Sequence, residues 1–214
     1  MNERVNARLH ATVHRHGGDF DQRRSRSYDR LARRTLRGLY RRVADDVAAV
    51  APRAGVVLDV GTGPGRLLHE VAARRDDLVL EGVDVSADMI AVARQAATER
   101  GLSGRLALQT ADVAALPYGV GGVDLVVTTL SMHHWPAVDA AAAELARVLR
   151  PGGSLLVYDF RFAPLTQALA ALGRQPAFAS TRTSRTPVRT PWSPVAVFTR
   201  LALTASDPSD PREG

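Results

Sequence analysis

The sequence predicts an α/β fold, a doubly wound, Rossmann-like sheet of seven strands that is mostly parallel and carries an antiparallel pair at its C-terminal edge. Two observations support this prediction. Short apolar, β-branched segments alternate with segments of helical periodicity from residue 56 to residue 158, an order typical of a parallel sheet covered by helices on both faces. Beyond residue 176, two β-rich stretches follow one another with no helix between them, which favours antiparallel pairing.

The elements follow from apolar spacing and from the residues that end helices. Strands are expected at residues 56–60, 78–83, 105–109, 123–128, 154–158, 177–183 and 195–203. Helices are expected from about Tyr28 to Pro52, and at residues 65–75, 87–100, 136–149 and 166–172. Ser86 and Gly101 suit the two ends of the third helix. Pro136 suits the first turn of the fourth, and residues 151–153 (Pro-Gly-Gly) are expected to form a turn.

Composition excludes several kinds of chemistry. The chain has 28 basic residues, all arginine, against 22 acidic residues, and it has no cysteine. Without cysteine and lysine there is no disulfide framework, thiolate metal site, cysteine nucleophile or Schiff base. Residues 1–55 hold 13 arginines against 6 acidic residues, whereas the remainder holds 15 against 16. Because the basic excess lies outside the main body, the net charge of +6 disfavours a nucleic-acid partner for that body.

The domain organisation follows from this charge pattern. Residues 1–26 are expected to form a flexible basic arm and residues 27–204 a single domain, in which 27–51 form a helical cap; residues 205–214 are expected to be a disordered tail. The apolar stretches are too short to cross a membrane and no secretory signal is visible, so the predicted location is the cytoplasm. His10, His14 and His16 lack a carboxylate at a matching spacing, so no metal site is predicted.

The segment over residues 56–65 (VVLDVGTGPG) indicates a ligand site. A strand runs into three glycines at alternate positions, which permits a tight turn and a close approach of the backbone to a ligand. The spacing departs from the G-x-G-x-x-G of dinucleotide sites, and Asp59 precedes the first glycine by two positions. A carboxylate there would repel a pyrophosphate but accept a cation. The sequence therefore favours a sulfonium nucleoside with an amino-acid tail.

Four further motifs follow this segment in a fixed order. They are VDVSADM at 83–89, ADV with LP at 111–117, DLVV with SMHHW at 124–135, and LRPGG at 149–153. With these motifs, the chain resembles the class I S-adenosylmethionine-dependent methyltransferases, of the small type similar to the ubiquinone/menaquinone-biosynthesis methyltransferases, over about residues 28–203. The resemblance implies S-adenosyl-L-methionine as cofactor and S-adenosyl-L-homocysteine as product.

The resemblance also assigns roles to individual residues. It implies that the cofactor is bound by Asp59, Gly61, Thr62, Gly63, Gly65, Asp84, Val85, Met89, Asp112, Val113, Leu130 and Ser131. Among these, Asp84 would accept hydrogen bonds from the ribose hydroxyls and Asp112 from the adenine amino group. Simpler explanations stay open: the glycines could serve only a turn, the two acids could lie on surface loops, and Met89 could belong to the core.

The predicted function is transfer of a methyl group to a small-molecule acceptor by in-line displacement. His133 and His134 are the candidate general bases, for an acceptor that must lose a proton. The N-terminal helix (residues 28–50) and the segment 182–194 are expected to cover the acceptor pocket. The segment carries Arg182, Arg185 and Arg189, which leaves an anionic acceptor open. Three alternatives remain: a nicotinamide-dependent oxidoreductase, a nucleic-acid methyltransferase that uses the basic arm, and a cofactor-binding protein without catalysis. The sequence leaves the oligomeric state open.

Overall fold

The computed structural model describes residues 22–163, 165–179, 183–191 and 195–207. Helix α2 (Gln22–Val50) begins earlier than predicted, because residues 22–27 contain neither glycine nor proline. The chain divides into two units within α2, after Arg34, and the second unit, from Thr35 onwards, contains the whole sheet. The three N-terminal histidines, Arg182 and most of the expected arm and tail lie outside the described residues.

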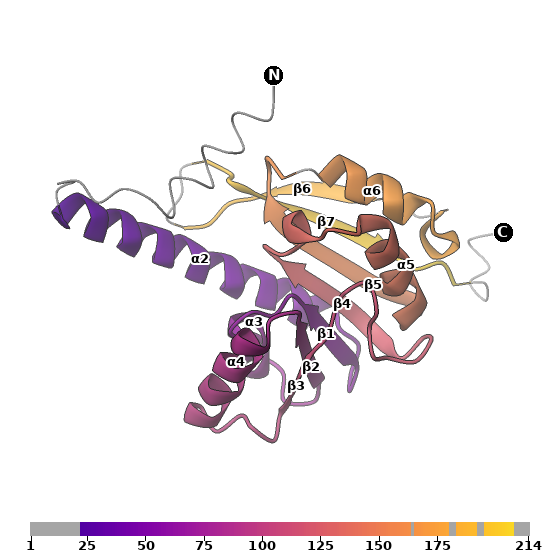
Figure 1. The fold of residues 1–214 in the computed structure, drawn as a ribbon, viewed down its shortest axis with the longest axis horizontal. Helices are drawn as coiled ribbons and strands as arrows, with labels where there is room; N and C mark the ends of the chain where they lie inside the picture. The colour runs from indigo at the N-terminus through magenta and orange to yellow at the C-terminus, as the bar shows by residue number, and fades with distance from the viewer. Residues whose placement is uncertain (1–21, 164, 180–182, 192–194, 208–214) are drawn as a thin grey trace. The chain divides into compact units, whose positions relative to one another are not determined.

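The second unit contains one seven-stranded sheet in the order β3-β2-β1-β4-β5-β7-β6. The strands are β1 (Val56–Val60), β2 (Val79–Asp84), β3 (Leu106–Thr110), β4 (Val123–Thr129), β5 (Leu149–Phe160), β6 (Ser184–Val188) and β7 (Phe198–Thr204). The first five strands run parallel, and β7 pairs antiparallel with both β5 and β6. The predicted fold class, including the antiparallel edge pair, is confirmed (Figure 1).

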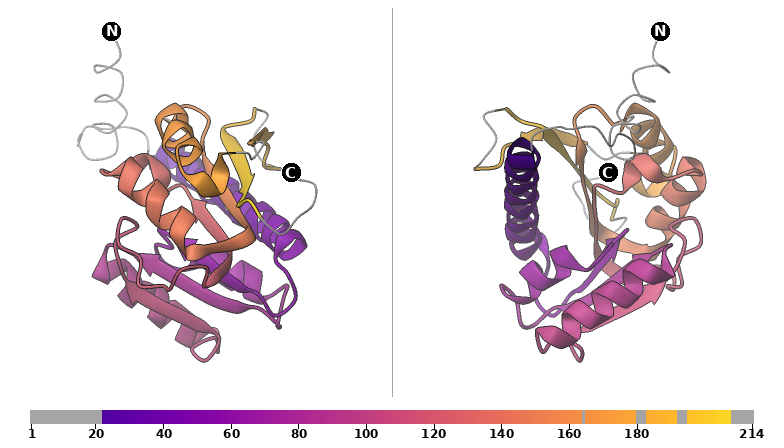
Figure 2. Two further views of the ribbon diagram at one scale, coloured as in Figure 1. Left: turned by 90° about the vertical axis from the view of Figure 1, so that its right-hand side faces the viewer. Right: turned by 60° about the vertical axis from the view of Figure 1, so that its left-hand side comes forward.

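Helices cover both faces of the sheet (Figure 2). They are α3 (Arg66–Ala72), α4 (Ala87–Glu99), α5 (Val138–Val148) and α6 (Leu165–Gly173), with short 3-10 turns η1 (Met132–His134) and η2 (Pro176–Phe178). Alternate strand residues enter two apolar clusters: Val57 packs with the helices α2, α3 and α4, whereas Leu58 packs with α5 and α6. The central strands β1 and β4 are mostly apolar because both of their faces are buried. No helix of the described residues is long and apolar enough to cross a membrane.

Local signals at helix ends are confirmed at α4 but not at α5. The Ser86 hydroxyl accepts a hydrogen bond from the Met89 N–H at 3.3 Å, and Gly101 adopts the left-handed conformation expected just beyond the helix (φ 70°). The expected role of Pro136 in the first turn of a helix is wrong. Helix α5 begins only at Val138, because residues 132–134 form a 3-10 turn that redirects the chain first.

Two predictions near the C-terminal edge are also corrected. The strand expected at residues 177–183 is displaced: Phe178 belongs to the η2 turn and is buried in the core, and β6 lies further along, at Ser184–Val188. Because β6 is the edge strand, it tolerates Pro187, which lacks a backbone N–H. The expected turn at 151–153 lies within β5. There the pairing register jumps from Val123–Leu149 to Leu125–Ser154.

Candidate active site

A cavity of about 640 Å³ opens at the carboxyl ends of β1, β2 and β4. This is the edge of an open α/β sheet at which ligands bind, and the volume lies in the range of small-molecule sites. Nine of the twelve residues predicted to bind the cofactor line it: Gly61, Thr62, Gly63, Asp84, Val85, Asp112, Val113, Leu130 and Ser131. Asp59, Gly65 and Met89 do not line it. Of the two predicted histidines, only His134 does.

The glycine-rich loop forms one wall of this cavity. The N–H groups of Gly61 and Thr62 both donate to the Val83 carbonyl at 2.9 Å, which fixes the loop to the end of β2. Gly61 has φ 73°, and a Cβ placed on it would overlap the Ser131 side chain. A Cβ on Gly63 (φ 52°) would meet no atom within 4 Å. The fold itself therefore requires Gly61, whereas Gly63 leaves open space beside the backbone.

Asp84 is held at the end of β2 by backbone donors. Its Oδ2 accepts from the Gly63 N–H at 2.8 Å and its Oδ1 accepts from the Ser86 N–H at 2.9 Å. Because a carboxylate has about four acceptor positions, both oxygens retain capacity for hydroxyl groups of a ligand. Asp112 lines the same cavity from the loop after β3 and accepts from the Ala114 N–H at 2.9 Å.

Asp59 lies behind the loop rather than on the cavity wall. Asp59 is 2% exposed. Its Oδ2 accepts from the Thr62 hydroxyl at 2.8 Å, and its Oδ1 has no hydrogen-bond partner among the described residues. Burial raises the pKa of Asp59 to about 7, helped by the nearby charge of Asp84 and opposed by the Thr62 hydrogen bond. An unpartnered buried carboxylate oxygen favours a positively charged group in the neighbouring cavity.

The loop after β4 supplies a further part of the cavity wall, next to the glycine loop. Leu130 adopts φ 57°, a left-handed conformation that is unusual for a residue with a side chain. Its N–H donates to the Tyr158 carbonyl at 2.8 Å, and the Trp135 indole N–H donates to the Ser131 hydroxyl at 3.1 Å. These contacts hold Leu130 and Ser131 against the glycine loop. Strained backbone of this kind is frequent at ligand sites.

The two histidines have different surroundings. Nδ1 of His133 lies 2.8 Å from Oδ1 of Asp159, a fully buried carboxylate at the end of β5. Asp159 also accepts from the His133 backbone N–H at 3.2 Å. His133 lines a separate cavity of about 60 Å³ beside α6, and its ring centroid lies 3.9 Å from that of His134. Because a carboxylate accepts, Nδ1 is the ring nitrogen placed to donate a proton to Asp159.

Sequence reasoning missed several residues of the site. Tyr40 on α2, Thr129, Trp135 and Pro136 line the main cavity. Asp159 is the partner of His133. The pKa of Tyr40 is raised first by burial and then by the charge of Asp59, so the two groups interact across the loop. An acidic residue at the carboxyl end of an otherwise apolar strand was the signal that could have identified Asp159.

Among the described residues, no group of three or more side chains is placed to bind a metal ion.

The strand order, the glycine loop after β1 and the carboxylate at the end of β2 agree with the Rossmann-like fold expected of a class I methyltransferase. The methyltransferase domain family matches residues 57–153. The matched segment is just under half of the chain, which is similar in sequence to the ubiquinone/menaquinone biosynthesis C-methyltransferase of Geotalea daltonii, at 30% identity over 122 residues.

The curated relatives are methyltransferases. The 27-O-demethylrifamycin SV methyltransferase of Amycolatopsis mediterranei is 33% identical over 139 residues, which cover 64% of this chain and 51% of the relative. The demethylmenaquinone methyltransferase of Thermus thermophilus is 36% identical over 120 residues, which cover 56% of this chain and 53% of the relative. The chain therefore spans about half the length of these two curated relatives.

Solved structures of low identity share the fold. A methyltransferase from Aquifex aeolicus, described as dependent on S-adenosylmethionine, is 17% identical, with a TM-score of 0.63 over 77% of this chain and 89% of that one. The [4+2]-cyclase SpnF is 24% identical, with a TM-score of 0.64 over 78% of this chain and 81% of that one. At these identities the likeness concerns the fold alone.

Proposed function

We propose that this protein transfers the methyl group of S-adenosyl-L-methionine to a small-molecule acceptor by in-line displacement and releases S-adenosyl-L-homocysteine. The observation that carries the proposal is the main cavity. It joins the glycine loop to the carboxylates of Asp84 and Asp112 at one edge of the sheet. The cofactor supplies an activated methyl group on a sulfonium, so the protein has mainly to bind, orient and exclude water.

The chemistry of the cavity fits this cofactor. Asp84, fixed by two backbone donors, would accept from the ribose hydroxyls, and Asp112 would accept from the adenine amino group. The open space beside Gly63 would let the amino-acid tail approach the backbone. Asp59 would attract the ammonium group of that tail from behind Thr62. The same carboxylate would repel the pyrophosphate of a dinucleotide, which disfavours a nicotinamide-dependent reaction.

The acceptor is proposed to lie on the side of the main cavity that carries His134. Two relatives are named for methyl transfer in rifamycin and menaquinone biosynthesis, which supports a small organic acceptor here. For a hydroxyl acceptor, Nε2 of His133 would remove the proton, and Asp159 would act as a positioning residue that fixes the ring and its tautomer. His134 would contact the acceptor between His133 and the cofactor.

A fold shared with a [4+2]-cyclase does not by itself specify methyl transfer, so the test must separate binding from turnover. The full chain is incubated with S-adenosyl-L-methionine and a panel of phenols and hydroxylated polyketides, and S-adenosyl-L-homocysteine is quantified. We expect acceptor-dependent product that is lost in Asp84→Ala. A chain that binds the cofactor but forms no product with any acceptor, while it cyclises a polyene, would refute methyl transfer.

A further inference from the structure

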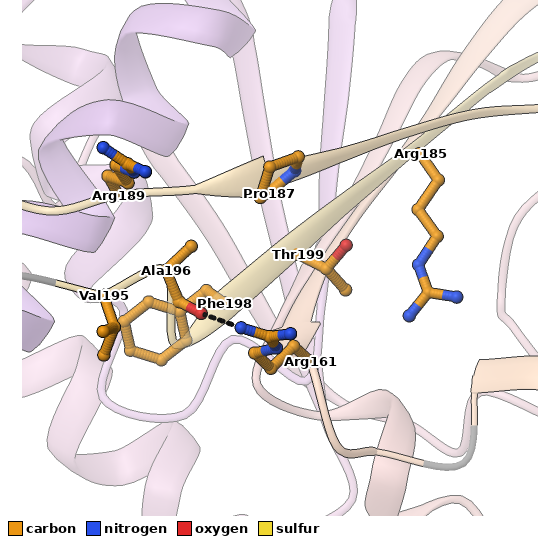
Figure 3. A pocket seen from close by; sticks show the side chains of 8 residues that line it. All are labelled: Arg161, Arg185, Pro187, Arg189, Val195, Ala196, Phe198 and Thr199. Atoms are coloured by element: carbon orange, nitrogen blue, oxygen red, sulfur yellow. Dashed lines mark hydrogen bonds between the residues drawn. The ribbon is translucent and has the colours of Figure 1, made fainter.

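A second cavity, of about 540 Å³, lies between the end of β5 and the β6–β7 hairpin (Figure 3). Three arginines line it: Arg161 follows β5, and Arg185 and Arg189 belong to β6 and the residues after it. The rest of the wall is mostly apolar and is formed by Pro187, Val195, Ala196, Phe198 and Thr199. None of the described residues that line this cavity is acidic.

The topology brings Arg161, Arg189 and the residues before β7 to the edge of the sheet that carries the first cavity, whereas Arg185 lies near the amino end of β6. Strand β6 is antiparallel to β7, which is antiparallel to β5, so β6 runs in the same direction as β5. Residues after β5 and β6, and those before β7, therefore meet at the carboxyl edge. A series of rings joins the two cavities. Centroid distances are 3.9 Å from His134 to His133, 5.6 Å from His133 to Phe160 and 5.5 Å from Phe160 to Phe198.

The charge of this cavity is not neutralised by the described residues. Arg161 donates to the Ala196 carbonyl at 3.3 Å and lies 5.4 Å from the Phe162 ring centroid, which orients it without pairing its charge. Arg185 and Arg189 form no ion pair with any residue in the described part of the chain. Elsewhere, arginines such as Arg75 and Arg147 are paired with carboxylates at 2.7 and 2.6 Å. Unpaired guanidinium groups around one hollow attract an anion.

We propose that this cavity binds an anionic group, a carboxylate or a phosphate, attached to an apolar body, and that this ligand is the methyl acceptor. The three arginines would hold the anion, and Phe198, Val195 and Pro187 would contact the apolar part. The second half of the proposal rests on the proposed function. Binding energy gained far from the reacting atom can be used to orient the acceptor at the methyl group.

The first test is direct binding to the full chain. Octyl phosphate, octanoate and octanol share an apolar chain and differ in charge, and each is titrated calorimetrically. We expect the two anions to bind at least about tenfold more tightly than octanol, because charge-assisted hydrogen bonds are about twice as strong as neutral ones. Arg185→Gln and Arg189→Gln should each weaken anion binding at least about fivefold. Comparing octyl phosphate with octanoate shows which anion is preferred.

Arg53→Gln is the matched control. Arg53 is exposed and precedes the amino end of β1, at the opposite edge of the sheet, and its substitution changes the net charge by the same amount. It should bind the anions as wild type does. Two results would overturn the proposal. If octanol bound as tightly as octyl phosphate and octanoate, binding would depend on apolar contact alone. If Arg53→Gln weakened anion binding as much as Arg185→Gln and Arg189→Gln do, binding would depend on overall charge.

The second test concerns the acceptor. Phenolic acids and their methyl esters are compared as acceptors, and the acids should show kcat/KM values at least about fivefold higher. That preference should disappear in Arg185→Gln, while affinity for S-adenosyl-L-homocysteine stays that of wild type. Equal rates for acids and esters would overturn the acceptor assignment. Failure of the wild type to bind S-adenosyl-L-homocysteine would refute the proposed function instead, without affecting the anion titrations.

Discussion

Replacing Gly61 by alanine perturbs the glycine loop where it passes the Ser131 side chain. The backbone at φ 73° costs an L-residue about 1–2 kcal/mol. The new Cβ would also overlap Ser131, and forcing an extra methyl group into a packed site costs about 1–3 kcal/mol. Displacing Ser131 would break its hydrogen bond with Trp135, which contributes about 1 kcal/mol. We therefore expect Gly61→Ala to lower the free energy of unfolding by about 3–6 kcal/mol.

Gly63→Ala is the matched control, because φ is also positive (52°) but no atom lies within 4 Å of the added Cβ. Only the backbone cost of about 1–2 kcal/mol applies. The protein should fold, yet bind S-adenosyl-L-homocysteine at least about tenfold more weakly, because the methyl group occupies space assigned to the ligand. Urea unfolding followed by tryptophan fluorescence gives the free energies, and calorimetry gives the affinities.

The double variant Gly61→Ala with Ser131→Gly isolates the overlap. Removing the Ser131 side chain leaves only its Cα, 3.9 Å from the new Cβ, an ordinary van der Waals distance. The double variant should recover about 1–3 kcal/mol relative to Gly61→Ala alone. Equal stability of the two single alanine variants, or no recovery in the double variant, would show that the loop does not pass Ser131 as described.

Three further predictions concern the titratable groups. Because the pKa of Asp59 is near 7, affinity for S-adenosyl-L-homocysteine should fall about tenfold between pH 8 and pH 6, as the carboxylate protonates. Asp59→Asn should remove this pH dependence of the affinity. If the affinity of Asp59→Asn varied with pH as that of the wild type does, the role of Asp59 would be contradicted. Since the folded pKa lies above the unfolded value of 3.8, stability of the free protein should decrease as pH rises from 4 to 7, less so in Asp59→Asn, as measured by urea unfolding. Asp159→Asn should lower kcat at least about tenfold at unchanged cofactor affinity. In a His133→Gln background, the Asp159→Asn substitution should lower kcat no further. Additive losses of kcat in the double variant would show that the two residues act independently.

Local signals made much of the loop predictable, whereas pairing across the sheet was not predictable. The glycines, Asp84 and Ser86 act on backbone groups close in sequence or at the adjacent strand end. Spacing identified the glycine turn and the Ser86 cap, whereas Asp84 was assigned through the family resemblance. The contact of His133 with Asp159 joins residues 26 positions apart and depends on the neighbouring positions of β4 and β5. Tyr40 reaches the cavity only because α2 packs on the sheet.

The edge of the sheet misled the sequence analysis for a different reason. Strand β6 is largely exposed and contains Arg185 and Pro187, so it lacks the apolar alternation that marks a half-buried strand. Phe178 supplied an apolar signal at the wrong place, because its side chain is buried from a 3-10 turn. The same exposure leaves the guanidinium groups of the second cavity facing a hollow surface, a feature visible only once β6 is placed beside β7.

Parallel calorimetric titrations of the full chain with S-adenosyl-L-homocysteine, NAD⁺ and NADP⁺ test the central claim most directly. The cavity that joins the glycine loop to Asp84 and Asp112 predicts saturable binding of S-adenosyl-L-homocysteine, weakened at least about tenfold in Asp84→Ala, and no binding of either dinucleotide. Binding of NAD⁺ or NADP⁺ without binding of S-adenosyl-L-homocysteine would contradict the account.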